Sequence, residues 1–196
     1  MFQVRIHGRG GQGVVTAAEM LSIAAFREGR HAQAFPSFGS ERMGAPVVAF
    51  CRLDNRQIRL REPVMKPDAV IIQDATLLHQ VDVFGGLVKD GYVLINTARD
   101  LDTLGIAEFV QGRRRDRFVT VNATELALKH IGRPVPNAAL LGAFAALTRQ
   151  ITLDSVAAAI EETFSEKIAR ANIAAASAAY ALVDAVVQEP AHVQAD

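Results

Sequence analysis

The chain opens on Met1-Phe-Gln-Val-Arg-Ile-His-Gly-Arg-Gly-Gly-Gln-Gly13, in which a short alternating apolar run leads into four glycines. Apolar residues continue after Gly13 at helical spacing, which predicts a strand, a glycine loop and a helix in succession. Gly8, Gly10 and Gly13 have the G-x-G-x-x-G spacing of a dinucleotide-binding turn. Such a turn leaves the N-terminus of the following helix open to an anionic group. This stretch therefore predicts an α/β fold with a candidate anion site in the loop.

A bound NAD would require more than this spacing. Dinucleotide-binding folds place an Asp or Glu about 20 residues further on, at the end of the second strand, where it holds the ribose hydroxyls. The second expected strand, His31-Ala-Gln-Ala-Phe-Pro36, ends without an acid. A P-loop is excluded because Gly13 is followed by Val14 and Val15 rather than by Lys and Ser or Thr. The loop therefore has two open interpretations, a site for an anion and a tight turn that packs a helix onto a strand.

Strand and helix patterns alternate over the first two thirds of the chain, and alanine-rich helices follow from Asn122 onward. This order predicts a doubly wound, Rossmann-like α/β fold with a mostly parallel sheet and a helical, Ala-rich C-terminal part. We expect a single domain over residues 1–187 and a C-terminal tail over 188–196. The expected strands after the first lie near 31–35, 46–53, 68–74, 92–96 and 117–121. The expected helices after the first lie near 76–84, 102–110, 152–163 and 165–187, and two more are expected to begin at Asn122 and at Asn137.

Composition limits the classes of partner. Lys plus Arg and Asp plus Glu number 21 each, so no overall charge favours nucleic acid or an anionic membrane. We recognise no signal peptide and no apolar run long enough to span a bilayer. The single cysteine, Cys51, excludes an internal disulfide and a cluster held only by cysteines of this chain, and it fits a reducing compartment. We therefore expect a cytoplasmic protein without nucleic-acid or membrane partners.

The candidate site residues follow the expected strands, where α/β sheets usually hold ligands. Arg42 could clamp a phosphate or a carboxylate, and Glu41 could pair with Arg42 or with a partner subunit. Asp74, at a strand end, is of a type that commonly caps the next helix. Further polar candidates at strand ends are Gln73, Thr76, Asn96 and Thr97. The residues expected to bind a ligand or a partner are Gly8, Arg9, Gly10, Gly11, Gln12, Gly13, Ser37, Phe38, Gly39, Ser40, Glu41 and Arg42.

The sequence offers no complete set of catalytic or metal-binding residues. Its five histidines are scattered singly, and none has metal-ligand spacing with another His, Cys or carboxylate. His7 is the only histidine near the glycine loop, and a lone His in such a place more often hydrogen-bonds the backbone than transfers protons. We assign no catalytic residue and no metal ligand. If the chain belongs to an enzyme, we expect the reaction centre to lie largely on another chain.

Two stretches together resemble a known family, Gly8-Arg-Gly-Gly-Gln-Gly13 and Ala34-Phe-Pro-Ser-Phe-Gly-Ser-Glu-Arg-Met-Gly-Ala-Pro46. They are similar to the gamma subunit of 2-oxoacid:acceptor oxidoreductases, of which pyruvate:ferredoxin oxidoreductase is the best-known member. The likeness continues in 68–74, 137–143 and 164–172, so it covers nearly the whole chain. The Phe-Pro-Ser-Phe-Gly loop resembles the pyruvate, 2-oxoisovalerate and phenylglyoxylate branches more closely than the indolepyruvate branch. The chain departs from many members at Met43-Gly-Ala45, where they have a second glycine.

This resemblance implies a subunit of a multisubunit enzyme that decarboxylates a 2-oxoacid oxidatively and joins the acyl group to coenzyme A. Thiamine diphosphate and Mg²⁺ would lie on alpha and beta subunits, and [4Fe-4S] clusters on an iron–sulfur subunit would pass electrons to ferredoxin, or a flavin subunit would pass them to NAD. No cofactor is expected on this chain alone. The loops 8–13 and 37–44 would face the thiamine-bearing core and shape access for coenzyme A. Two alternatives stay open, a stand-alone NAD-dependent dehydrogenase and a structural adaptor without a ligand.

Overall fold

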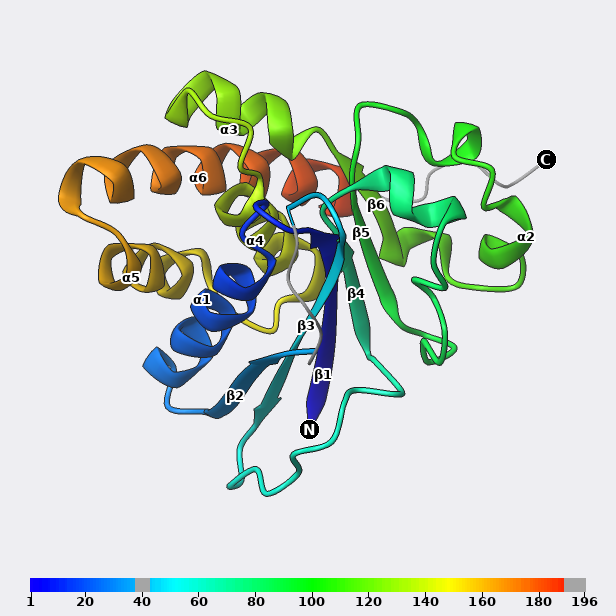
Figure 1. Ribbon diagram of the computed structural model, residues 1–196, viewed down its shortest axis with the longest axis horizontal. Coiled ribbons are helices and arrows are strands. Elements are labelled where there is room, and N and C mark those ends of the chain that lie inside the picture. Colours follow the sequence, from blue (N-terminus) through cyan, green and yellow to red (C-terminus); the bar gives the residue numbers. More distant parts are fainter. Residues whose placement is uncertain (38–42, 189–196) are drawn as a thin grey trace.

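A six-stranded sheet forms the centre of the computed structural model, which describes residues 1–37 and 43–188 (Figure 1). Across the sheet the strands follow the order β2-β3-β1-β4-β5-β6. The strands β1, β4, β5 and β6 pair in parallel, whereas β3 is antiparallel to both β1 and β2. Among these strands only β3 therefore runs against the others, and the mostly parallel sheet predicted from the sequence is confirmed. The strands are β1 (Phe2–Arg9), β2 (His31–Pro36), β3 (Pro46–Asp54), β4 (Ala69–Ile72), β5 (Tyr92–Asn96) and β6 (Phe118–Val121).

The long helices gather on one face of the sheet (Figure 1). They are α1 (Val14–Arg27), α3 (Ala123–Ile131), α4 (Asn137–Thr148), α5 (Leu153–Thr163) and α6 (Glu166–Gln188). Helix α4 contacts the sheet and α1, α3, α5 and α6, and each of its twelve residues is buried. The alanine-rich α6 packs mainly across α4 rather than on the sheet. Its buried residues Ala175, Ala176 and Ala179 present only methyl groups, so the helix axes approach closely.

Short helical turns and loops cover the opposite face of the sheet. A second apolar cluster there joins residues of β4, β5 and β6 to these turns. The helix expected near 102–110 is divided into two short pieces at Gly105, whose φ of +72° does not belong to a right-handed helix. The helix expected near 76–84 is a single 3₁₀ turn. The segments are η1 (Ala75–His79), η2 (Leu101–Thr103), α2 (Ala107–Val110) and η3 (Arg115–Arg117).

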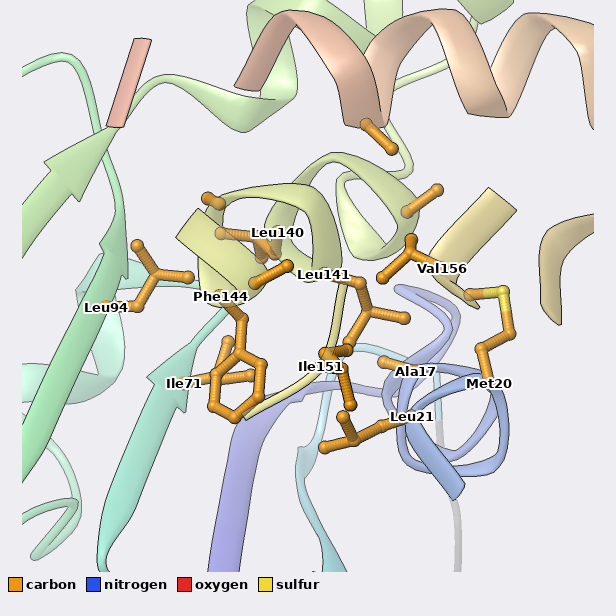
Figure 2. Close-up of a cluster of buried hydrophobic side chains, with 14 of the residues drawn as sticks. Ala17, Met20, Leu21, Ile71, Leu94, Leu140, Leu141, Phe144, Ile151 and Val156 are labelled. Atoms are coloured by element: carbon orange, nitrogen blue, oxygen red, sulfur yellow. The ribbon is translucent and has the colours of Figure 1, made fainter. Parts of the chain in front are cut away.

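The main apolar cluster lies between α4, α1 and the sheet (Figure 2). Side chains of α4 occupy its centre, with strand residues on one side and α1 residues on the other. Fully burying a Leu or Phe side chain contributes roughly 1.5–3 kcal/mol, so this cluster fixes α1 firmly over the sheet. The N-terminus of α1 is thereby held beside the glycine loop. The labelled members are Ala17, Met20, Leu21, Ile71, Leu94, Leu140, Leu141, Phe144, Ile151 and Val156.

The sequence predicts no membrane-spanning run, but the length and mean hydropathy of α6 would suit one. One side of this helix is packed against α3, α4 and α5, and its buried residues belong to the main cluster. These contacts fix one side of α6 to the folded domain, while 28% of its most apolar stretch is buried. Helix α6 ends at Gln188, and the rest of the expected tail, 189–196, lies outside the described residues.

Candidate functional site

The polar residues expected at strand ends gather along one edge of the sheet. The strands β1, β4 and β5 are parallel neighbours, so Arg9, Asp74 and Asn96 all come from their carboxyl ends. Asn96 Nδ2 donates to the main-chain oxygen of Gln73 at 2.8 Å and to Thr124 Oγ1 at 2.8 Å. Strand β2 runs in the same direction as β1, so the loop that begins at Ser37 also starts at this edge.

The glycine loop lies between β1 and α1, as the sequence predicts, and its glycines permit close packing. A Cβ atom added at Gly8 would lie 2.6 Å from Val14 Cγ2. Gly13 precedes α1 with a φ of +72°, and a Cβ atom there would lie 2.6 Å from Asn137 Nδ2. These glycines therefore let α1 approach both β1 and α4, which is the packing role considered from the sequence.

Helix α1 begins without a hydrogen bond from a capping side chain, and its first turn holds no acidic residue. The first N–H groups of a helix have no partner within the helix, and the helix dipole favours negative charge beside them. Two hollows flank this end of α1, with volumes of about 240 and 270 Å³. The first is lined by Arg9, Gly10, Gly11, Gly13, Val14, Val15, Thr16 and Val47. The second is lined by Gly11, Gly13, Thr16, Ile131, Arg133, Val135, Asn137, Phe164, Ile168 and Asn172.

The Arg9 side chain is held by four hydrogen bonds. Its Nε donates to Asp74 Oδ2 at 3.0 Å and its Nη1 to the main-chain oxygen of Gly44 at 3.1 Å. Its Nη2 donates to Thr76 Oγ1 at 2.7 Å and to Gln80 Oε1 at 2.8 Å. The guanidinium group therefore joins the glycine loop to the segment before β3 and to the segment after β4.

Asp74 is the centre of this network. Its Oδ2 also accepts from Gln12 Nε2 at 3.0 Å, and its Oδ1 accepts from the Thr76 main-chain nitrogen at 3.0 Å, so it caps η1 as expected. Partial burial by itself raises the pKa of Asp74, but the hydrogen bonds from Thr76 and Gln12 and the charge of Arg9 outweigh it. The net result is a pKa below the ordinary value of an aspartate. Asp74 is therefore a carboxylate at neutral pH and balances the charge of Arg9.

The two stretches that carry the family resemblance are hydrogen-bonded to each other. The Gly10 nitrogen donates to the Ala45 oxygen at 2.9 Å, and the Gly44 nitrogen donates to the Gly10 oxygen at 3.1 Å. Among the expected binding residues of the second stretch, Ser37 lies within the described residues, and its main-chain nitrogen donates to the Val48 oxygen at 2.8 Å. The other expected binding residues of this stretch, Phe38, Gly39, Ser40, Glu41 and Arg42, lie outside the described residues.

His7 differs from its expectation. Its side chain is 4% exposed, and neither ring nitrogen has a hydrogen-bond partner within the described part of the chain, so the expected bond to the backbone is not formed. Burial, together with the nearby charge of Arg5, lowers the pKa of His7 to about 3. His7 is therefore neutral at physiological pH. The side-chain amide of Gln73 is also buried and without a described partner.

The strand order does not fit a bound dinucleotide. In dinucleotide-binding folds the second strand of the unit lies beside the first, so an acid at its end can reach the ribose. Here β3 lies between β1 and β2, and β2 ends at Pro36 without an acid. Over residues 1–37 and 43–188 no group of three His, Cys, Asp or Glu side chains could hold a metal ion. What the described site offers for binding is the set of main-chain N–H groups at the uncapped start of α1.

The chain is similar over most of its length to proteins of one family. A family model described as pyruvate ferredoxin/flavodoxin oxidoreductase matches residues 3–182. The pyruvate synthase subunit PorC of Methanocaldococcus jannaschii is 48% identical over 180 residues, which cover 92% of this chain and 96% of that protein. The pyruvate/ketoisovalerate oxidoreductases common subunit gamma of Pyrococcus abyssi is 44% identical over 180 residues, with coverages of 92% and 96%. The crystal structure of pyruvate oxidoreductase subunit PORC from Thermotoga maritima has a TM-score of 0.76 and 37% identity, and the match covers 92% of this chain and 95% of that one. The chain therefore belongs to the pyruvate ferredoxin/flavodoxin oxidoreductase family, as a gamma subunit of a multisubunit 2-oxoacid:ferredoxin oxidoreductase.

Proposed function

We propose that this gamma subunit shapes the path by which coenzyme A reaches the reaction centre of the complex. The complex would decarboxylate a 2-oxoacid oxidatively, transfer the acyl group to coenzyme A and pass the electrons to ferredoxin. Thiamine diphosphate and Mg²⁺ would lie on alpha and beta subunits, and [4Fe-4S] clusters on an iron–sulfur subunit. The assembly would work in the cytoplasm. Substrate choice would rest with the thiamine-bearing chains, because the described site of this chain presents no acid–base pair directed at a substrate.

The observation that supports this role is the direct pairing of the glycine loop with the segment before β3. Main-chain hydrogen bonds join Gly10 to Gly44 and Ala45, so this part of the second stretch lies directly beside the glycine loop. The uncapped N-terminus of α1 lies at the same place. Coenzyme A carries phosphate and pyrophosphate groups, which suit the main-chain donors of a helix N-terminus.

A steady-state experiment on the purified complex tests the proposal. Gly13→Ala should raise the KM for coenzyme A and leave the KM for the 2-oxoacid unchanged, because a Cβ atom at Gly13 would displace Asn137 or the loop. Arg42→Ala should also raise the KM for coenzyme A while the complex stays assembled. Gly112→Ala is the matched control, since Gly112 has a similar φ of +75° but no atom within 4 Å of the added Cβ.

Native mass spectrometry with cofactor analysis checks assembly in each case. Co-purification with thiamine- and iron–sulfur-bearing chains is the expected result. If Gly13→Ala and Arg42→Ala complexes are fully assembled and keep the wild-type KM for coenzyme A, the subunit is a structural adaptor and the proposal is wrong. An isolated chain that binds NAD and turns over a substrate would contradict it more directly.

A further inference from the structure

We propose that Asp74 is a positioning residue, which holds Arg9 and Gln12 so that the glycine loop keeps the conformation that admits coenzyme A. The inference rests on the proposed coenzyme A path. It assigns to Asp74 a role in the use of coenzyme A, whereas its position at a strand end predicts only a helix cap. It also assigns to Arg9 the role of a tether rather than of an anion ligand.

Both side chains of the glycine loop point to the same carboxylate oxygen. Residues 8–13 contain four glycines, so only Arg9 and Gln12 carry side chains. Arg9 Nε and Gln12 Nε2 each lie 3.0 Å from Asp74 Oδ2. Two further bonds close the turn, since Gln12 Oε1 accepts from the Arg9 nitrogen at 2.8 Å and the Gln12 nitrogen donates to the Arg9 oxygen at 3.0 Å. The loop is therefore fastened at both of its side chains.

The guanidinium group of Arg9 has few N–H donors left for a ligand. An arginine has five N–H donors. The Arg9 side chain makes four hydrogen bonds, to Asp74, Gly44, Thr76 and Gln80. Its charge is balanced by Asp74, and the two side chains are 21% and 17% exposed. Little of this group remains for a phosphate, so the ligand-facing part of the loop is its main chain.

Conformational entropy also favours a restraint on the glycine loop. Glycine loses more conformational freedom on ordering than any other residue, so a loop of four glycines needs external restraint to keep one conformation. Asp74 supplies that restraint from the end of β4, 65 residues along the chain from Arg9. Without the carboxylate, Arg9 and Gln12 would lose their common partner, and the loop would have to be ordered when the ligand binds.

The direction in which Asp74→Asn changes the KM for coenzyme A shows whether Arg9 is held in place by Asp74 or binds the ligand directly. If Arg9 bound a phosphate of coenzyme A directly, removing the charge of Asp74 would free the guanidinium and lower the KM or leave it unchanged. If Asp74 positions the loop, Asp74→Asn should raise the KM for coenzyme A by about ten- to a hundred-fold, since a displacement of about 1 Å can cost as much as roughly a hundred-fold. The KM for the 2-oxoacid should stay at the wild-type value. Asn keeps one oxygen for the η1 cap, so the change falls on the side that faces Arg9 and Gln12, where an NH2 group replaces the shared acceptor Oδ2 and the negative charge is lost.

The experiment measures both KM values in the assembled complex. Asp74→Glu restores the charge and should recover part of the lost affinity. Gln12→Leu should also raise the KM for coenzyme A, and the double variant with Asp74→Asn should be no worse than Asp74→Asn alone, because the two residues act as one unit. Glu162→Gln is the control, since it removes the Arg27–Glu162 ion pair between α1 and α5. It should leave both KM values unchanged.

Each outcome decides the matter. The positioning role is wrong if Asp74→Asn leaves the KM for coenzyme A unchanged or lowers it while Gly13→Ala raises it. The proposed coenzyme A path would stand in that case. Unchanged values in both variants show that the path itself is wrong. If Asp74→Asn does not assemble, Gln12→Leu decides, because it leaves the Arg9–Asp74 pair intact; a wild-type KM for coenzyme A in that variant also overturns the proposal.

Discussion

Replacing Gly142 with alanine should destabilise the protein, although alanine is the better helix former. Gly142 lies in the middle of α4, where α6 crosses it. An added Cβ atom would lie 2.0 Å from the main-chain oxygen of Ala176 and 2.6 Å from its carbonyl carbon. Ordinary contacts of this kind begin at 3.4 Å, so α4 and α6 would have to separate by the difference, about 1.4 Å.

The expected size of this effect follows from two opposing terms. Overpacking a core typically costs 1–3 kcal/mol, and a clash with a helix backbone belongs at the upper end because no side chain can rotate away. Replacing glycine inside a helix returns roughly 0.5–1 kcal/mol. We therefore expect Gly142→Ala to lower the free energy of unfolding by about 2 kcal/mol.

Urea unfolding of the full chain measures this change, with the slope of the transition used to check two-state behaviour. Ala174→Gly, at an exposed position of α6, measures the helix-propensity term alone and should cost about 1 kcal/mol or less. Ala176→Gly should not rescue Gly142→Ala, because the clash involves the main chain of residue 176 and not its methyl group. A Gly142→Ala protein as stable as the wild type, or rescue by Ala176→Gly, would refute the reasoning.

Three further changes have definite expected outcomes. Phe144 is 1% exposed in the main cluster, and Phe144→Ala should lower the free energy of unfolding by about 3–5 kcal/mol in the same assay. A loss below about 1 kcal/mol would show that the cluster contributes little to stability. The pKa of His7 lies near 3 in the folded chain, well below the ordinary value of 6.5. Between these pH values only the unfolded chain takes up the proton, so the free energy of unfolding decreases as the pH decreases. At pH 5 this loss should reach about 2 kcal/mol relative to neutral pH; His7→Leu should remove it, and His31→Gln, at an exposed position, should not. Burial raises the pKa of the Cys51 thiol well above its ordinary range, so iodoacetamide should modify Cys51 only after the chain unfolds. Mass spectrometry follows the modification, and rapid labelling of the folded chain would contradict this prediction.

The sequence predicts which residues form strands and helices better than it predicts which elements lie beside one another. Residues 46–53 are recognised as a strand by their composition and flanking turn, and β3 covers nearly the same residues. Its position between β1 and β2, however, depends on antiparallel pairing with both, such as Val4 with Cys51 and Ala34 with Cys51. Register of this kind is decided by contacts between residues distant along the chain, which periodicity does not report. The place of α6 on α4 was unpredictable for the same reason.

The candidate site shows the same difference between local features, which the sequence predicts, and contacts between distant residues, which it does not. Its glycines are recognisable because their spacing is local, and Asp74 is recognisable because it ends a strand. The partners of Arg9 are not, since Gly44, Thr76 and Gln80 are 35, 67 and 71 residues away from it. His7 looked like an ordinary polar residue near a loop, and only the packing of the sheet reveals that its ring is buried. What a side chain touches depends on the whole fold, whereas what the backbone does depends mostly on its own sequence.

The complete burial of α4 has a consequence for hydrogen exchange. A helix with no face toward solvent cannot release its amide protons by local fraying of one side, so exchange at its centre requires the surrounding helices and the sheet to separate. The amides of α4 should therefore be among the slowest to exchange in the molecule, at a rate that reports global opening. Those of the short turns η1 and η2 should exchange by local opening, long before the core does.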